Sequence, residues 1–235
     1  MEQTLKITNV LADPTRFSIY NYIVNQNREV TVQEIADEFS IHPNVARLHL
    51  SKLEDVGMLK SENKKTGRGG RPSRIYRLSH EVIEFSFPAR DWRFLAKIAI
   101  DSLNSLGDDG KKVFFETGHR YGFEQMEQHL SKHSIPKEEL TLDQKMEILS
   151  EAASALGYQP NIRVPEDGKN FYLEVFNCPF QEIAIEHADL ICRMHSEFIR
   201  GMMEALFDRM ELSMIQTVFQ GCDSCAYHVK VATEN

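Results

Sequence analysis

Apolar residues at helical spacing predict three short helices in the first 60 residues of the chain. Asp13 and Pro14 are typical of a helix start, because Asp accepts hydrogen bonds from free amides and Pro suits the first helical position. Phe17, Tyr20 and Val24 then recur on one face. This pattern predicts a first helix of about three turns with these three residues on its inner face.

The stretch TVQEIADEFS predicts a second helix, and NVARLHLSKLEDVGMLK predicts a third. Thr31 is a candidate cap for the second helix, with Glu34 as its partner in a capping box. Pro43 opens the third helix and Gly57 ends it. The residues expected to face the core are Ile35, Ala36, Phe39, Ala46, Leu50 and Leu53.

Helix, short turn, helix is the arrangement that places a second helix in the major groove of DNA. Asparagine can form two hydrogen bonds with adenine and arginine two with guanine, so Asn44 and Arg47 are predicted to read bases. An ordinary solvated helix would also carry polar residues on this face, and the helix alone leaves both interpretations open. The predicted DNA-facing residues are Asn44, Val45, Arg47, Leu48, Ser51 and Lys52.

The next segment, MLKSENKKTGRGGRPSRIYRLS, reads as a strand, a glycine-rich loop and a second strand. Its charge is one-sided, since only Glu62 opposes the basic residues within the hairpin. The phosphates of DNA attract such charge, and binding through it is strongly salt dependent. The hairpin is therefore predicted to be a DNA-binding wing. Its candidate contacts are Lys64, Lys65, Arg68, Arg71 and Arg74.

Three stretches, LADPTRFSIYNYI, TVQEIADEFSIHPNVARLHLSKLEDVGMLK and GRGGRPSRIYRLS, resemble the winged-helix regulators of the arsenical-repressor type. The resemblance covers about the first 80 residues. In that family Ser40 is commonly glycine and His42 is commonly serine or threonine, so this chain departs from the pattern at the turn and at a helix cap. The resemblance implies a regulator that binds double-stranded DNA.

The rest of the chain predicts helices and two hairpins. Helical spacing runs through ARDWRFLAKIAIDSLNSL, GKKVFFETGHRYGFEQMEQHLSKH, LDQKMEILSEAASALGY and NCPFQEIAIEHADLICRMHSEFIRGMMEALF. NIRV pairs with FYLEVF, and ELSMIQTVFQ with AYHVKVA. The expected fold class is α+β, mostly helical, with a small antiparallel sheet. The expected domains are a winged helix-turn-helix at residues 1–80, a helical connector or dimerisation region at 81–140, and a cysteine-containing α+β sensor domain at 141–235.

The helices of the middle region carry apolar residues, and the sequence leaves open what these residues pack against. They can make a dimer interface or line a ligand cavity, and an ordinary core is the simplest interpretation for Phe114, Phe115, Phe123 and Met126. The residues concerned are Trp92, Leu95, Ile98 and Leu103 on one face of the first helix, and Phe114, Phe115, Tyr121, Phe123 and Met126 on the second.

Charge is distributed unevenly along the chain. The formal net charge is -8, yet residues 43–77 hold 9 basic and 3 acidic residues. Local positive charge beside a helix-turn-helix pattern indicates DNA binding more directly than the total does. No apolar run is long enough to span a bilayer and the N-terminus lacks a signal-peptide pattern. A cytoplasmic protein without a membrane partner is therefore expected.

All four cysteines lie in the last quarter of the chain. The reducing compartment expected for this protein favours thiols or metal ligands over disulfides. Cys178 precedes Pro179 at a helix start, where amides can lower a thiol's pKa. A continuous helix would separate Cys178 from Cys192 by about 20 Å. The two can share a metal only if the helix breaks, and the sequence HADL offers a place for that break.

His195 follows Cys192 by three residues and shares its helical face. There are thus five candidate ligands for four coordination positions. This set of ligands suits an iron-sulfur cluster or a cysteine-rich zinc site. The C-x-x-C pair can instead be a redox pair, and Cys192 and His195 can be core residues. The candidate metal ligands are Cys178, Cys192, Cys222, Cys225 and His195.

The segments NCPFQEIAIEHADLICRMH and GCDSCAYHV resemble the C-terminal domain of winged-helix regulators related to the bacterial repressor of the Suf iron-sulfur assembly operon. The resemblance implies a dimeric repressor in which a cluster, held by the cysteines matching Cys178, Cys192 and Cys225, sets DNA affinity. Cys222 belongs less clearly to that pattern, and the type of cluster stays open.

The combined prediction is a homodimeric bacterial transcription regulator, with a repressor favoured, that binds an inverted-repeat operator and senses iron-sulfur or redox status. The dimer follows from operator geometry, because two recognition helices one helical turn apart need a two-fold protein. The alternatives are the same regulator with a zinc ion or an apolar small-molecule effector and, more remotely, a thiol-disulfide redox protein. No hydrolase triad or phosphate-binding loop is visible, so no enzyme activity is predicted.

Overall fold

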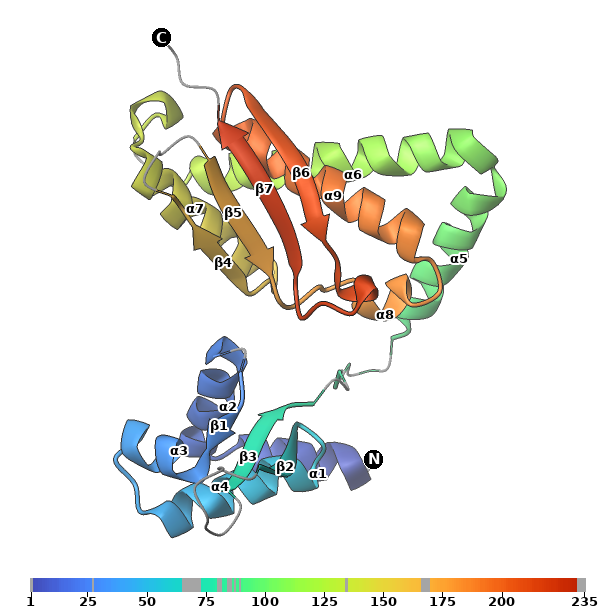
Figure 1. The fold of residues 1–235 in the computed structure, drawn as a ribbon. Helices are drawn as coiled ribbons and strands as arrows, with labels where there is room; N and C mark the ends of the chain where they lie inside the picture. Colours follow the sequence, from blue (N-terminus) through green and yellow to red (C-terminus); the bar gives the residue numbers. More distant parts are fainter. Residues whose placement is uncertain are drawn as a thin grey trace. The chain divides into compact units, whose positions relative to one another are not determined.

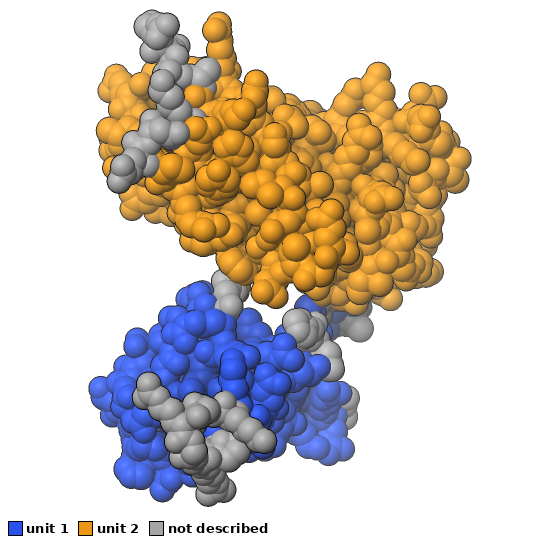
Figure 2. Space-filling model, in the orientation of Figure 1, with its two compact units in different colours: residues 1–90 blue, residues 91–235 orange. Residues whose placement is uncertain are grey.

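The protein is described here by a computed structural model (Figure 1). It describes residues 2–26, 28–64, 73–79, 82–83, 86, 88, 90–133, 135–165 and 170–231. The chain divides into two compact units, residues 1–90 and 91–235, which are coloured separately in Figure 2. Residues 91–140, expected to form a connector or dimerisation region, belong to the second unit.

The first unit is a group of four helices with a three-stranded antiparallel sheet in the order β1-β3-β2. The three helices and the hairpin expected from the sequence are confirmed as α2, α3, α4 and β2–β3, whereas α1 and β1 were not expected. The helices are α1 (Glu2–Leu11), α2 (Pro14–Gln26), α3 (Val32–Glu38) and α4 (Pro43–Asp55). The strands are β1 (Val30–Thr31), β2 (Leu59–Lys64) and β3 (Ser73–Leu78).

The turn between α3 and α4 depends on local backbone chemistry. Thr31 caps α3 by accepting a hydrogen bond from the Glu34 amide at 3.1 Å, as expected. The prediction that the Glu34 side chain completes a capping box with Thr31 was wrong, because the Glu34 carboxylate pairs with Arg28 instead. Ser40 has a positive φ of 51°, a conformation that glycine adopts without cost, which explains why glycine is common there in the resembling family. His42 then caps α4 through its side chain.

The inner face of α2 differs from the prediction. The buried residues are Arg16, Ile19 and Ile23, whereas Phe17 is 46% exposed. The guanidinium of Arg16 is buried because it donates to the carbonyl of Val10 at 2.9 Å and pairs with an acidic neighbour. A charged residue satisfied in this way occupies a core position that the apolar pattern could not identify. The unexpected helix α1 supplies part of this environment.

The second unit packs helices against one side of a four-stranded antiparallel sheet in the order β4-β5-β7-β6 (Figure 1). Both predicted hairpins are confirmed, and the fold is α+β and mostly helical. The helices are α5 (Trp92–Ser105), α6 (Gly107–Leu130), α7 (Leu142–Ala155), α8 (Gln181–Ala184) and α9 (Ala188–Leu206), with short 3-10 helices η1 (Lys137–Glu139) and η2 (Val218–Gln220). The strands are β4 (Pro160–Arg163), β5 (Asn170–Val175), β6 (Met210–Gln216) and β7 (Cys225–Val231).

The long helices α6 and α9 cross with their backbones in contact, and glycines make this possible. A Cβ atom added at Gly122 would lie 1.9 Å from the carbonyl oxygen of Phe198. One added at Gly201 would lie 2.0 Å from the carbonyl oxygen of His119. Any larger residue at either position must therefore push the two helices apart. This crossing fixes where α9 presents its first turns.

The apolar face of α5 is exposed, which leaves the interface and ligand-cavity interpretations of this face open. Trp92, Leu95 and Ile98 are 68%, 56% and 48% exposed, and Ile100 is the buried residue of the helix. Residues three and four positions apart lie on one helical face, so the three form a continuous apolar strip. Singly exposed apolar residues are common, but a strip of this kind marks an interaction surface.

We expect Gly122→Ala to lower the free energy of unfolding by about 1–3 kcal/mol, because the methyl group meets backbone that cannot turn away. Chemical denaturation measures this change. The sign is diagnostic, since Gly→Ala in an unobstructed helix interior stabilises by about 1 kcal/mol. Gly118→Ala is the graded control. Its methyl group would meet the flexible Met194 side chain at 2.9 Å and the Met194 carbonyl oxygen at 3.0 Å, both longer than the 1.9 Å contact at Gly122, so the cost should be smaller.

Candidate DNA-binding surface and cysteine centre

Helix α4 presents the side chains predicted to face DNA. Its core face, Ala46, Leu50 and Leu53, is fully buried, as the sequence predicted. On the opposite face Arg47 donates to the Asn44 side-chain oxygen at 3.4 Å, a weak contact that DNA can replace. The exposed side chains are Asn44, Val45, Arg47, Leu48 and Lys52, while Ser51 is half-buried.

The described part of the wing carries charges that are already paired. Lys64 lies 2.7 Å from Glu29, and Arg74 lies 2.7 Å from Glu54. Glu62 is the acidic residue of the hairpin itself, and tertiary packing brings in further carboxylates from outside the hairpin. Exposed ion pairs of this kind are weak and can be exchanged for phosphate contacts. Lys65, Arg68 and Arg71, the other predicted wing contacts, lie outside the described residues.

The helical segment after Cys178 breaks where the sequence suggested. Helix α8 ends at Ala184, and α9 begins at Ala188 with His187 at its N-cap. The break lets Cys192 and His195 sit in the first turns of a new helix rather than far along the old one. His195 is 2% exposed, and its Nδ1 lies 3.8 Å from the sulfur of Cys178.

The C-x-x-C pair reaches the same end of the sheet. Strands β5 and β7 pair antiparallel with Val175 opposite Cys225, so the end of β5, just before Cys178, adjoins the start of β7. All four cysteines are free thiols. Burial raises the pKa of Cys178, and the charges of Cys225 and Cys192 act in the same direction.

Burial controls the protonation of this cluster. It raises the pKa of Cys178 to about 11, even though the Phe180 amide acts in the opposite direction. The expectation that helix-terminal amides would lower this pKa was wrong, because desolvation outweighs one hydrogen bond. Burial likewise lowers the pKa of His195 to about 4, so its imidazole is neutral at physiological pH. A neutral imidazole is the form that binds metals.

His195 has an unsatisfied nitrogen. Its ring stacks on Tyr158 with centroids 5.2 Å apart and meets Phe180 edge-on. Its Nε2 is buried without a hydrogen-bond partner. A buried polar atom that makes no bond costs free energy, and this cost is typical of sites whose partner is a bound group.

The predicted ligands do not close around a single ion. Across the part of the chain that the structure describes, the group of three ligand atoms within 4.8 Å of one another is formed by His129, His133 and Glu151, not by the cysteines. Sequence reasoning did not identify that group. The four-residue spacing of the two histidines was the available signal, because such residues share one helical face.

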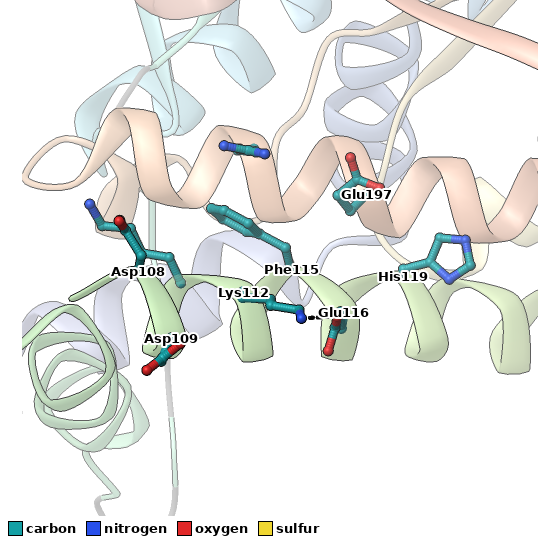
Figure 3. Close-up of a pocket in the computed structure, with 9 residues that line it drawn as sticks. Asp108, Asp109, Lys112, Phe115, Glu116, His119 and Glu197 are labelled. Carbon is teal, nitrogen blue, oxygen red and sulfur yellow. Dashed lines mark ion pairs between the residues drawn. The ribbon is translucent and has the colours of Figure 1, made fainter. Parts of the chain in front are cut away.

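An open groove of about 560 Å³ runs between α6 and α9 (Figure 3). Phe115 lies in this groove, with the guanidinium of Arg193 4.6 Å from its ring centroid. Charged residues dominate the lining, which does not suit an apolar small molecule. The lining residues are Asp108, Asp109, Lys111, Lys112, Phe115, Glu116, His119, Arg193 and Glu197.

No described helix combines the length and apolar character that a membrane span requires. Two solved structures similar to the chain are a trafficking protein particle complex subunit 3 from Naegleria fowleri, covalently bound to palmitic acid, and the phenol-responsive sensory domain of the transcription activator PoxR with phenol. The first is 14% identical with a TM-score of 0.42, and the match covers 60% of this chain and 97% of that one. The second is 14% identical with a TM-score of 0.44, covering 79% and 89%.

Both structural likenesses are too distant to support an argument about function. No curated protein matches the chain. Residues 11–62 match the family model of a helix-turn-helix domain. This segment includes α2, α3 and the whole of α4, the elements that present the DNA-facing side chains. The match supports a DNA-binding transcriptional regulator.

Proposed function

We propose that the protein is a homodimeric bacterial repressor that binds an inverted-repeat operator and responds to an iron-sulfur cluster held by Cys178, Cys192 and Cys225. The proposal is supported by the 3.8 Å contact between the Cys178 sulfur and the buried, unsatisfied His195, and by the pairing of Val175 with Cys225, which brings the end of β5 beside the start of β7. Cys222 and His195 are the candidates for a fourth place. The resemblance to regulators of the Suf type supports the choice of cluster.

The spacing of the thiols favours a cluster over a single ion. Ligands of one zinc ion must lie within a few ångströms of one another, and the described cysteines form no such group. In a four-iron cluster each thiolate binds a different iron atom, so the ligands of that cluster type stand farther apart than those of one zinc ion. A zinc ion is the second candidate, and the cysteines would have to move inward to bind it.

Binding a metal must overcome the raised thiol pKa values. The cysteines ligate as thiolates, so metal binding releases their protons and the metal's charge compensates for the burial that otherwise opposes ionisation. Without the metal, the same burial keeps Cys178 protonated and unreactive. The cluster would thus act as a link between α9 and the end of the sheet.

A thiol-disulfide enzyme is the weaker interpretation of the C-x-x-C pair. In such enzymes the pair commonly lies at a helix N-terminus, which lowers the pKa of the attacking thiol. Here Cys222 follows the 3-10 helix η2 and Cys225 begins strand β7. Burial raises the pKa of Cys225 rather than lowering it.

The proposed dimer uses the exposed apolar strip on α5, and its partner is a second copy of this chain. Trp92, Leu95 and Ile98 provide the large apolar side chains that the buried part of a homodimer interface requires. An operator with two half-sites demands two recognition helices related by a two-fold axis. The strip precedes α6, so changes in the second unit can reach the interface through one helix junction.

We expect Arg47→Ala to weaken binding to the specific operator by about 1–3 kcal/mol and to relax base preference, if Arg47 reads a guanine. Fluorescence anisotropy on operator and random duplexes at fixed salt measures both effects. Arg71→Ala is the comparison variant and should weaken all sequences alike. Equal losses on operator and random DNA for Arg47→Ala would show that this residue contacts only phosphate.

We expect Cys225→Ser to abolish the iron-sulfur absorbance of anaerobically purified protein and to fix DNA binding in its metal-free state. Serine has nearly the size of cysteine but is a far poorer ligand for soft metals. Cys222→Ser should keep the chromophore if His195 or an external ligand takes the fourth place. Wild-type metal content and an unchanged response to oxidation in Cys225→Ser would return the cysteines to a packing role.

We expect Leu95→Asp and Ile98→Asp to convert the dimer into a monomer, because each places a charge inside the proposed apolar interface. Light scattering coupled to size-exclusion chromatography measures the mass. Met214→Asp is the matched control, since Met214 is 46% exposed but lies on β6, away from the strip. A dimer that persists in both α5 variants would contradict the assignment of this face.

A further inference from the structure

Two histidines and a carboxylate meet where α6 ends beside α7, away from the cysteines. His129 lies in the last turn of α6, and His133 follows four residues later. Glu151 comes from α7, a helix in contact with α6 (Figure 1). The three ligand atoms lie within 4.8 Å of one another, which is the arrangement of a metal site.

The chain after α6 places both imidazoles on one side. The amides of Lys132 and His133 donate to the carbonyls of His129 and Leu130 at 3.1 and 2.9 Å, so the helix continues as tight turns past its end. The two imidazole rings therefore lie along one face, tilted by 46° to each other with centroids 5.8 Å apart. Backbone bonds hold this geometry without any help from a ligand.

The distances from His129 and His133 to Glu151 are longer than the ion pairs of His119 and His187 and are compatible with a shared ion. His129 Nε2 and His133 Nε2 lie 3.5 and 3.9 Å from the same Glu151 oxygen. Elsewhere in the protein, His119 and His187 approach their carboxylates to 2.8 and 3.0 Å. Ligands about 2.0–2.1 Å from a tetrahedral zinc ion stand about 3.4 Å apart, close to the separations seen here.

We propose that His129, His133 and Glu151 bind a divalent transition-metal ion of the zinc class. Two imidazoles and one carboxylate suit Zn²⁺, Co²⁺ or Ni²⁺, whereas Mg²⁺ and Ca²⁺ prefer oxygen ligands alone. Glu151 is 53% exposed at its side chain and His129 only 17%, so solvent reaches the ion from the carboxylate side. Water then completes the coordination. This site is independent of the cysteine centre and of the proposed cluster.

The ion would connect α6 to α7 across the segment that joins them. Residues 131–141 contain the short η1 helix and otherwise no regular element among the described positions. A metal that binds only the folded arrangement stabilises it in proportion to its occupancy. The same ion would hold the C-terminal end of α6, the helix that α9 crosses.

The test uses full-length protein freed of metal by a chelator and titrated with Co²⁺, followed by calorimetry and absorption. We expect one Co²⁺ to bind with weak visible bands and without the near-ultraviolet charge-transfer band of a thiolate ligand. His133→Gln should weaken this binding about 100-fold or more, because removing a direct ligand costs more than losing the groups that merely orient it. Zn²⁺ should compete for the site and raise the thermal midpoint.

Two further variants keep the test decisive. Glu151→Gln changes a half-exposed side chain, so it should fold even if His133→Gln does not, and it should also lose Co²⁺ affinity. Glu147→Gln is the matched control, because Glu147 is exposed one turn earlier on the same helix, and its Co²⁺ affinity should equal that of wild type. Wild-type affinity in both ligand variants, or a thiolate band for every bound Co²⁺, would overturn the proposal.

Discussion

The backbone-to-backbone crossing of α6 and α9 is the constraint on which the second unit depends. Gly122 and Gly201 allow each helix to touch the carbonyl oxygens of the other, so the separation of the two axes is set by main chain rather than by flexible side chains. Everything that the two helices carry is positioned by this contact. The first turns of α9 hold Cys192 and His195, and the last turn of α6 holds His129.

Burial gives the cysteine centre its chemical character. The core that packs α9 against the sheet encloses His195 and Cys178, lowers the pKa of the imidazole and raises that of the thiol. Both groups are therefore neutral without a metal, and a positive metal centre reverses the balance for the thiol. In the proposed sensor, occupancy of the metal site would change the state of the protein, because burial keeps the Cys178 thiol protonated without a metal.

The DNA-binding unit divides recognition between a rigid helix and a basic hairpin. Helix α4 is fixed by a fully buried face, so Asn44 and Arg47 are presented at a defined orientation. Lys64 and Arg74 already have carboxylate partners from outside the hairpin, which must be exchanged if these residues contact phosphate. Specificity would then rest on the helix, and the pairing with Glu29 and Glu54 would reduce the non-specific attraction that the charge count alone suggests.

The sequence by itself determined the elements governed by local chemistry: the Thr31 cap, the ending of α4 at Gly57, the stripe from Ala46 to Leu53, both hairpins and the break before α9. Each follows from neighbours a few residues apart. Only the tertiary structure decided what depends on distant partners. Arg16 is core because of the Val10 carbonyl, the α5 strip is exposed because none of the described helices covers it, and Glu151 meets two histidines because α7 packs beside α6. Pairing between residues far apart in the sequence carries no periodic signal along the chain.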